Sequence, residues 1–497
     1  MTRTPSKKPV VILGGGLAGF AAAMTLVDHG FPVTVIEKMP VLGGRTASIT
    51  VSNEDPVPGF EPGDPLDHGL HAWFPHYENL LRLMQRAGCL QNLKFQPAEL
   101  FYYADDTGFE HIRVPSCPPP FHLFAMLLRK KGISFADKLK VLLGLGWKDI
   151  VWFNQRGNHR LDRESFAAWL KRKGFPPSVV RKVLAPEILS TTALPPEACS
   201  ARTALSWLNY AHRRARNLRL GILLKGMTEG MVRPMAEYCR ARGATLLHGT
   251  VRCLGYDPVL NRIRLESVDP WYPHPHFPAP PERALALDDE AVVLSALPFD
   301  ALRDILPPEL LLTSFFQPLQ RMEWAPFVAV RLWIDRPLTT CQNFILSADT
   351  VFDVMLAVSN VYPNPSMTIL DLVISNRQHF ADVPLQEMSL HRTEAGKRLL
   401  ERAIQDVQRV FRVTLPREAV RKQYIHLRKG ILAQTVGSLE LRLPQATPVD
   451  NLILAGDWTR HNANQCMEGA VVSGVLAANV LLRRAGLPEV PVLGPHS

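Results

Sequence analysis

Three glycines near the start of the chain have the types and spacing of a phosphate-binding turn. Gly14, Gly16 and Gly19 follow the short apolar run of residues 10–13 and precede a stretch of helical composition. The first glycine allows a tight turn, the second lets a pyrophosphate approach the backbone, and the third lets the helix lie close to the strand. The positive end of the helix favours the phosphate charge. The pattern predicts a dinucleotide-binding site.

An acidic residue and a second glycine turn extend this expected site. Glu37 ends the next apolar strand, where a carboxylate can accept hydrogen bonds from ribose hydroxyls. Gly43, Gly44 and Arg45 follow shortly after, and a glycine turn with a guanidinium suits a second approach to a pyrophosphate, which favours FAD over NAD. The residues expected to contact the cofactor in this half are Gly14, Gly16, Leu17, Ala18, Gly19, Glu37, Lys38, Gly43, Gly44 and Arg45.

A second pattern of apolar strand, glycine and acid lies near the end of the chain. In NLILAGDW (451–458), Asp457 is placed to accept hydrogen bonds from a ribityl chain. A helix is expected to begin at about Met467, with the backbone N–H groups of its first turn facing the pyrimidine edge of a flavin. The residues expected to contact the cofactor here are Gly456, Asp457, Met467, Glu468, Gly469 and Ala470.

Four blocks of sequence carry a family resemblance. They are the N-terminal glycine fingerprint with its second turn, LDHGLHAWFPHYENLLRLMQRAG (66–88), SARTALSWL (200–208), and LAGDWT with QCMEGAVVSG. Together they resemble the flavin amine oxidase superfamily, and within it the phytoene and zeta-carotene desaturases, especially the plant- and cyanobacterial-type zeta-carotene desaturases. Val475 departs from that family, in which a basic residue is usual after Ser-Gly.

The resemblance implies further flavin contacts. Val251, taken as part of the strand TLLHGTVRCL, would meet the adenine side through its backbone, and Leu297–Pro298 would form a turn beside the cofactor. Gly69 and His71 would lie near the isoalloxazine. His71 is the candidate catalytic residue, and the alternative is a structural, hydrogen-bonded histidine.

The expected fold class is α/β, with a Rossmann-like FAD-binding domain of the glutathione-reductase type and an inserted α+β substrate domain. We assign residues 1–105, 226–305 and 426–497 to the discontinuous FAD-binding domain, and 106–225 and 306–425 to the substrate and membrane-docking domain. The run PFVAVRLWID (326–335) suits a strand in a sheet that roofs a substrate cavity.

Charge is concentrated in one region of the chain. The net charge is +10, and residues 118–225 hold 20 Lys and Arg against 6 Asp and Glu. Within that region, residues 121–153 are apolar, aromatic and studded with cations, a pattern typical of interfacial helices on an anionic membrane. The alternative is a core element with a solvated face. No run is long and apolar enough to span a bilayer, and the expected location is cytoplasmic and peripherally membrane-associated.

Other partner classes receive little support from the sequence. The Trp, Phe and Leu content and the lack of a nucleic-acid motif argue against nucleic acid as the partner of the basic region. The seven cysteines have no metal-ligand spacing, so we expect neither a metal nor disulfides.

The resemblance implies desaturation of a hydrophobic isoprenoid polyene by hydride transfer from an allylic carbon to flavin N5, with a quinone as electron acceptor. Three alternatives share the fold: a hydroxysqualene dehydroxylase, a carotene isomerase and a carotene desaturase/methyltransferase. A fourth, of a different class, is a flavin-less lipid-binding escort protein.

Overall fold

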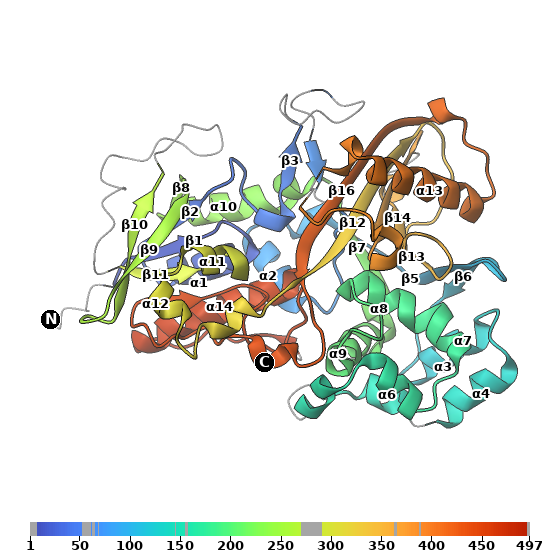
Figure 1. Ribbon diagram of the computed structural model, residues 1–497, viewed down its shortest axis with the longest axis horizontal. Helices are drawn as coiled ribbons and strands as arrows, with labels where there is room; N and C mark the ends of the chain where they lie inside the picture. Colours follow the sequence, from blue (N-terminus) through green and yellow to red (C-terminus); the bar gives the residue numbers. More distant parts are fainter. Residues whose placement is uncertain are drawn as a thin grey trace.

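The computed structural model describes residues 7–51, 61, 65–67, 69–144, 146–154, 158–269, 291–361, 365–386 and 389–494. A parallel five-stranded sheet forms one half of the molecule, in the order β17-β11-β1-β2-β8. Its strands are β1 (Val10–Leu13), β2 (Val33–Glu37), β8 (Thr245–His248), β11 (Val292–Ser295) and β17 (Leu452–Leu454). Segments from both ends of the chain therefore build one sheet (Figure 1).

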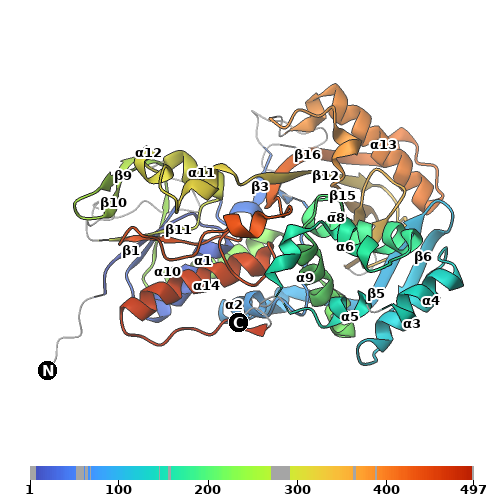
Figure 2. The same ribbon diagram turned by 60° about the horizontal axis from the view of Figure 1, so that its bottom comes forward.

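Both faces of this sheet are covered, as a buried parallel sheet requires. Alternate residues of β1 face opposite sides, so Val10 and Ile12 join one core and Val11 and Leu13 another. On the first side lie α1 (Leu17–Asp28), α10 (Arg233–Arg240) and α14 (Met467–Arg484), as Figure 2 shows. On the second lie the hairpin of β9 (Val251–Asp257) and β10 (Arg262–Val268), with α11 (Phe299–Ile305) and α12 (Pro308–Leu311). The expected Rossmann-like domain is confirmed.

A second, eight-stranded sheet forms the other half, in the order β16-β12-β15-β14-β13-β5-β6, with β7 also paired to β5. Most of its pairings are antiparallel, but β13 runs parallel to β5. The long helix α13 (Glu394–Phe411) packs on one face (Figure 1). The strands are β5 (Leu93–Ala104), β6 (Gly108–Arg113), β7 (Arg219–Leu223), β12 (Trp324–Ile334), β13 (Ile345–Ser347), β14 (Val354–Ala357), β15 (Thr368–Ile374) and β16 (Val420–Leu432).

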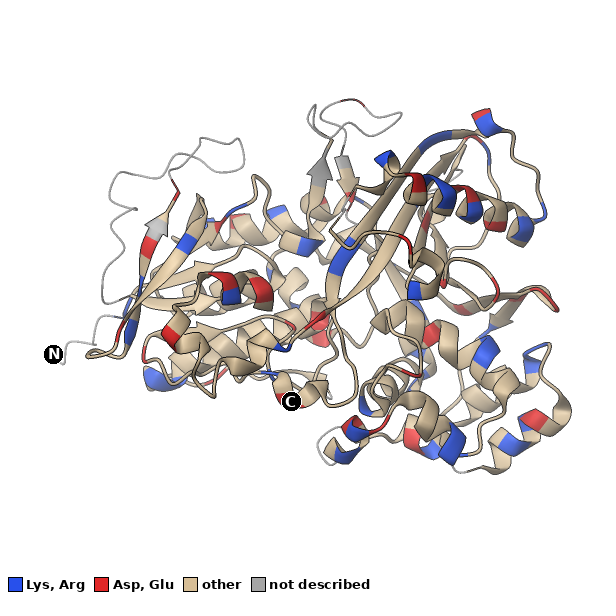
Figure 3. Cartoon of the chain, viewed as in Figure 1, with Lys and Arg blue, Asp and Glu red and all other residues tan. Residues whose placement is uncertain are grey.

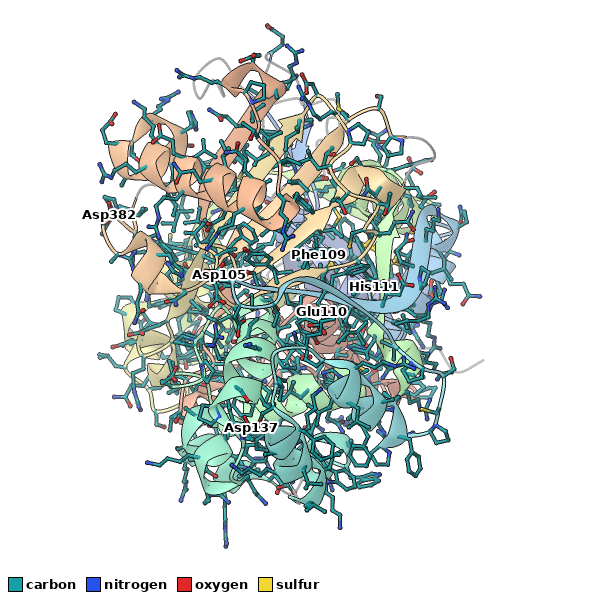
Figure 4. All side chains as sticks on the ribbon, turned by 90° about the vertical axis from the view of Figure 1, so that its right-hand side faces the viewer. Asp105, Phe109, Glu110, His111, Asp137 and Asp382 are labelled. Carbon is teal, nitrogen blue, oxygen red and sulfur yellow. The ribbon has the colours of Figure 1, made fainter. Side chains whose placement is uncertain are left out.

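A group of helices lies against the β5–β6 end of this sheet. It comprises α3 (Phe121–Arg129), α4 (Phe135–Leu143), α5 (Gly146–Val151), α6 (Phe166–Arg172), α7 (Pro177–Val179), α8 (Ala185–Thr192) and α9 (Ala201–His212). Figure 4 shows Glu110 and His111 on the β5–β6 hairpin above these helices, with Asp137 on them. A buried ion pair between Lys130 and Glu110 joins the two parts. Lysines and arginines recur over α3, α4 and α6 (Figure 3).

Two small elements connect the halves: the ribbon of β3 (Ser48–Thr50) and β4 (Pro65–Asp67), and α2 (Glu78–Arg86). The expected strand at residues 326–335 is confirmed as β12 (Trp324–Ile334), and the expected helix start at Met467 is confirmed by α14. The assignment of residues 1–105 to one domain needs correction at its end. β5 (Leu93–Ala104) pairs with β6, β7 and β13 and therefore belongs to the second sheet. The sequence does not show which strands lie at its edges.

Candidate cofactor site

The first glycine turn brings the start of α1 close to the sheet. Gly14 has φ 103°, and a Cβ at Gly19 would lie 2.1 Å from the Gly14 carbonyl oxygen, so only glycine fits there. A Cβ at Gly14 would lie 3.2 Å from the carbonyl oxygen of Ala296, in the turn that precedes Pro298 and α11. The N-cap residue of α1, Gly16, makes no side-chain cap, so the helix presents backbone N–H groups at the turn. This geometry suits a pyrophosphate.

Glu37 lies beside the same turn. One carboxylate oxygen accepts a hydrogen bond from the Gly15 amide at 2.8 Å, and the other from the Met39 amide at 2.9 Å. Burial raises the pKa of Glu37 above its usual value, although the two amides oppose this effect. The carboxylate is fixed at the end of β2, and each oxygen keeps a lone pair for a ribose hydroxyl. Lys38 is exposed, and its carbonyl accepts from His248 at 3.2 Å.

The second glycine turn packs directly on the first. Gly43 and Gly44 have φ values of 112° and 55°, and the Gly43 amide donates to the Gly15 carbonyl at 2.8 Å. Gly16 and Gly43 form a parallel bridge. Two turns that are separate in the sequence thus form one glycine-lined surface, as a ligand with two phosphates requires.

Arg45 joins the N-terminal and C-terminal halves of the site. Its guanidinium donates to the Asp457 carboxylate at 2.7 Å and to the carbonyl of Gly430 on β16. Arg45 is partly exposed, with 41% of its side-chain surface accessible, whereas Asp457 is buried. Nearby, the Gly456 amide donates to the Ser473 hydroxyl of α14 at 2.8 Å. The N-terminal and C-terminal segments expected to share the cofactor site are therefore in direct contact.

The start of α14 lies where the sequence placed it, but the Glu468 side chain faces another helix. Its carboxylate accepts hydrogen bonds from the Asn79 and Leu80 amides and from the Asn79 side chain, at 2.7–3.0 Å. Burial raises the pKa of Glu468 to about 7. The Glu468 side chain therefore holds the N-terminus of α2 through these hydrogen bonds, and contacts of Met467, Glu468, Gly469 and Ala470 with the cofactor stay a prediction. The sequence did not show that Asn79 meets Glu468, because the two residues lie 389 positions apart.

Gly69 and His71 lie against the second sheet. Gly69 has φ 140°, and a Cβ there would meet the Ala329 side chain of β12 at 3.5 Å. His71 Nδ1 lies 3.0 Å from the Gly69 carbonyl oxygen. Because a carbonyl only accepts, Nδ1 carries the proton, and the basic lone pair of a neutral ring is on Nε2. Burial lowers the pKa of His71, which favours that neutral ring.

A charged cluster that sequence reasoning missed lies on the same sheet face. Arg331 of β12 donates to Asp371 of β15, with one contact at 2.6 Å, and lies 3.6 Å from Asp67. Although burial opposes it, the charge of Asp371 raises the pKa of Arg331. Asp67 also accepts from Ser48 at 2.7 Å. Asp67 lies on β4 and Asp371 on β15, so only the folded structure shows that both carboxylates are neighbours of Arg331.

The segment TLLHGTVRCL, which was expected to be a single strand, forms two strands in the structure. Gly249 and Thr250 turn the chain out of the parallel sheet, and the Gly249 amide donates to the Glu37 carbonyl at 2.8 Å. Val251 begins β9, in the hairpin that covers the sheet. Leu297 lies as expected beside the site, where its carbonyl accepts from Trp458 at 2.9 Å.

Comparison with known proteins places this site in a family. The profile of flavin-containing amine oxidoreductases matches residues 17–482. The chain belongs to this family. Among solved structures, putrescine oxidase bound to putrescine is similar, with a TM-score of 0.65 and 17% identity over 96% of this chain and 99% of that one. An oxidoreductase from Methanosarcina mazei is also similar, with a TM-score of 0.66 and 15% identity over 96% and 100% of the two chains. These structures support the fold.

Two curated relatives cover nearly the full length of this flavin oxidoreductase. One is the 15-cis-phytoene desaturase of Synechococcus elongatus, 25% identical over 96% of both chains. The other is the probable zeta-carotene desaturase of the same organism, 25% identical over 95% of this chain and 98% of the relative. The resemblance to carotenoid desaturases is confirmed. The identities do not separate the phytoene branch from the zeta-carotene branch.

The cofactor of this oxidoreductase is FAD, and the site fits it. The paired glycine turns suit the pyrophosphate, Glu37 the ribose, and Asp457 with the start of α14 the ribityl and pyrimidine parts. The enzyme is an FAD-dependent oxidoreductase that acts on CH–CH bonds. The alternative of a flavin-less escort protein is set aside by the oxidoreductase family match.

Proposed function

We propose that this flavoenzyme desaturates a carotenoid or a related isoprenoid polyene. The observation that carries the proposal is the near-full-length similarity to two carotenoid desaturases, combined with a cofactor site closed by Arg45 and Asp457. FAD, when bound, supplies a two-electron acceptor for hydride removal from an allylic carbon, which side chains cannot provide. The chain itself binds the cofactor, orients the polyene and removes a proton.

His71 is our candidate for the proton acceptor. Burial lowers its pKa, although Asp67 and backbone contacts with Gly69 and Arg45 oppose this effect, and the Nδ1 proton bonded to the Gly69 carbonyl leaves the lone pair of the neutral ring on Nε2. We expect His71→Asn to lower the turnover rate while FAD content and the flavin absorption spectrum stay unchanged. Unchanged turnover would assign His71 the purely structural role of holding Gly69.

The substrate is tested with purified enzyme and polyenes embedded in vesicles. We expect consumption of phytoene or zeta-carotene, seen by product chromatography, with an added quinone as electron acceptor. Arg45→Met serves as the comparison variant, because we expect the loss of this guanidinium at the glycine turns to weaken cofactor binding. Consumption of hydroxysqualene, isomerisation without loss of hydrogen, or aromatisation of rings would instead support one of the three related activities.

We also propose that α3, α4 and α5 dock on an anionic membrane, from which a water-insoluble polyene would be drawn. Large apolar side chains are exposed here, including Phe135 and Leu143 at 73%, Phe121 at 61% and Trp152 at 57%. Exposed cations lie among them on Lys131, Lys140 and Lys148. Exposed apolar groups with neighbouring cations suit an interface of acyl chains and anionic headgroups. Among the residues that the structure describes, no helix is long and apolar enough to cross a bilayer.

Vesicle sedimentation tests this surface. We expect the wild type to sediment with phosphatidylglycerol vesicles, less with phosphatidylcholine, and Phe135→Ser with Trp152→Ser to remain in solution. Leu312→Ser is the matched control, since Leu312 is 80% exposed but lies outside this region. Equal sedimentation of the double variant and the control would contradict docking through these helices.

A further inference from the structure

A small polar cavity of about 20 Å³ lies among α9, the segment that joins β16 to β17 and the segment that joins β17 to α14. Its volume is enough for one small ion or a water molecule. Its lining includes Arg202 of α9, Gln434 and Arg442 from the segment after β16, and Asn464 from the segment before α14. All four side chains are at least nine-tenths buried, with exposures of 5–6%. The cavity is therefore closed in by polar groups from both halves of the molecule.

The charges around this cavity do not balance. Two guanidiniums line it, but only one carboxylate, Asp162, whose oxygens accept from the Ser200 hydroxyl at 2.6 Å and the Leu439 amide at 3.0 Å. Over the described part of the chain, no carboxylate oxygen lies within 4.0 Å of Arg442. The Asp457 carboxylate, the nearest along the loop, pairs with Arg45 instead. A buried cation with no carboxylate in direct contact is costly, so the site favours one additional negative charge.

Several of the described residues that line the cavity carry buried polar atoms without hydrogen-bond partners, mostly donors, although Gln465 Oε1 is an acceptor. Within the described residues, Arg442 Nε, Gln434 Nε2 and Asn464 Nδ2 are buried and have no hydrogen-bond partner. Arg442 Nη2 donates to the Asp457 carbonyl at 2.9 Å and also lies 2.9 Å from His461 Nε2. Each unsatisfied buried donor costs about 1–3 kcal/mol. An anion satisfies several donors at once, whereas one water molecule accepts only two hydrogen bonds and adds no charge.

We propose that this cavity binds a small monovalent anion of about the size of chloride. The anion would join α9 of the second domain to the loop 457–466, which runs from the ribityl-binding Asp457 to the start of α14. Binding would hold that loop in place and slow the loss of FAD. The site is separate from the cradle made by the glycine turns, and its existence does not depend on which polyene is the substrate.

The test uses the FAD-loaded protein in sodium chloride, sodium bromide or sodium gluconate at equal ionic strength. We expect chloride and bromide to raise the unfolding temperature saturably and to slow FAD release several-fold, and gluconate, which is too large for the cavity, to do neither. Crystals grown in bromide should show anomalous scattering between Arg442 and Asn464. Equal unfolding temperatures in chloride and gluconate, or a water molecule without anomalous signal in the cavity, would overturn the proposal.

A built-in charge provides the decisive variant. Asn464→Asp places a carboxylate on the wall of the cavity that Arg442 also lines, so we expect a stable, yellow protein whose unfolding temperature no longer depends on chloride. Asn479→Asp is the control, because Asn479 is equally buried but bonds to the backbone of Val490, far from the cavity in the fold. That variant should be destabilised and keep its chloride dependence. Retained chloride dependence in Asn464→Asp would count against the site, whatever the enzyme's activity on polyenes.

Discussion

Arg45 connects segments of the cofactor site that lie 412 residues apart in the sequence. Hydrogen bonds to charged groups contribute about 1.5–3 kcal/mol each, so we expect Arg45→Met to weaken FAD binding roughly ten- to a hundredfold. Fluorescence titration of the apoprotein with FAD measures the change. Arg233→Met removes an exposed ion pair with Glu229 on a helix surface and serves as the control. Equal affinities of the two variants for FAD would show that Arg45 contacts only other residues of the protein and does not contribute to cofactor binding.

Glu468 gives the protein a specific pH dependence. Because its pKa is raised from 4.5 to about 7 in the folded state, the folded protein holds this proton more tightly than the unfolded chain does. Its stabilising contribution is therefore complete below about pH 4.5 and is lost as pH rises towards about 7. We expect urea unfolding of Glu468→Gln to lack this part of the pH dependence. If the three hydrogen bonds from α2 lowered the pKa of Glu468 as much as burial raises it, the free energy of unfolding would depend on pH in the same way in the wild type and in the variant.

The packing of α1 on α14 is the contact between elements on which the cofactor site depends. A Cβ at Gly474 would lie 2.2 Å from the carbonyl oxygen of Ala18, in the first turn of α1. Overpacking of this kind typically costs about 1–3 kcal/mol. We expect Gly474→Ala to lower the free energy of unfolding by that amount and to reduce FAD content, measured by denaturation and absorbance.

Gly226→Ala is the control for that substitution. Its Cβ would meet only the Ser48 hydroxyl oxygen at an ordinary distance of 3.4 Å. We expect its stability and FAD content to stay near those of the wild type. A similar loss in both variants would mean that the effect came from general glycine replacement and not from the approach of the two helices.

Removal of FAD should loosen the whole cofactor half of the molecule. A ligand at a hundredfold excess over its dissociation constant stabilises the folded state by about 2.7 kcal/mol. Stripping the flavin should therefore lower the unfolding temperature. Hydrogen exchange should increase in β1, β2 and the start of α14, and much less in β12 and α13, whose core is separate. Equal protection in both sheets after stripping would contradict the assignment of the cofactor to the parallel sheet.

The separation into two sheets also explains which domain boundaries could be predicted. The glycine turns indicated the segments of the cofactor domain, and the basic, apolar region indicated a segment of the substrate domain. The strand β12 was also recognisable from its sequence. The membership of β5 was not, because both sheets contain apolar strands of similar composition. Only pairing with β6, β7 and β13 decided where this strand belongs.

The sequence by itself determined the features whose physical demands are local. The glycines at 14, 19 and 43, the acid that ends β2 and the helix start at Met467 follow from how closely a backbone must approach a phosphate, a carbonyl or a flavin. Each demand involves a few neighbouring residues, so residue type and spacing are enough to reveal it.

Only the tertiary structure decided which distant side chains meet. It turned Glu468 towards α2, assembled Arg331 with Asp67 and Asp371, and enclosed Arg442 beside Arg202. These groups come from separate strands, helices and loops, and their energies depend on burial and on charges contributed by the other half of the chain. Burial and charge pairing depend on the complete folded structure, so no local sequence pattern could have predicted these contacts.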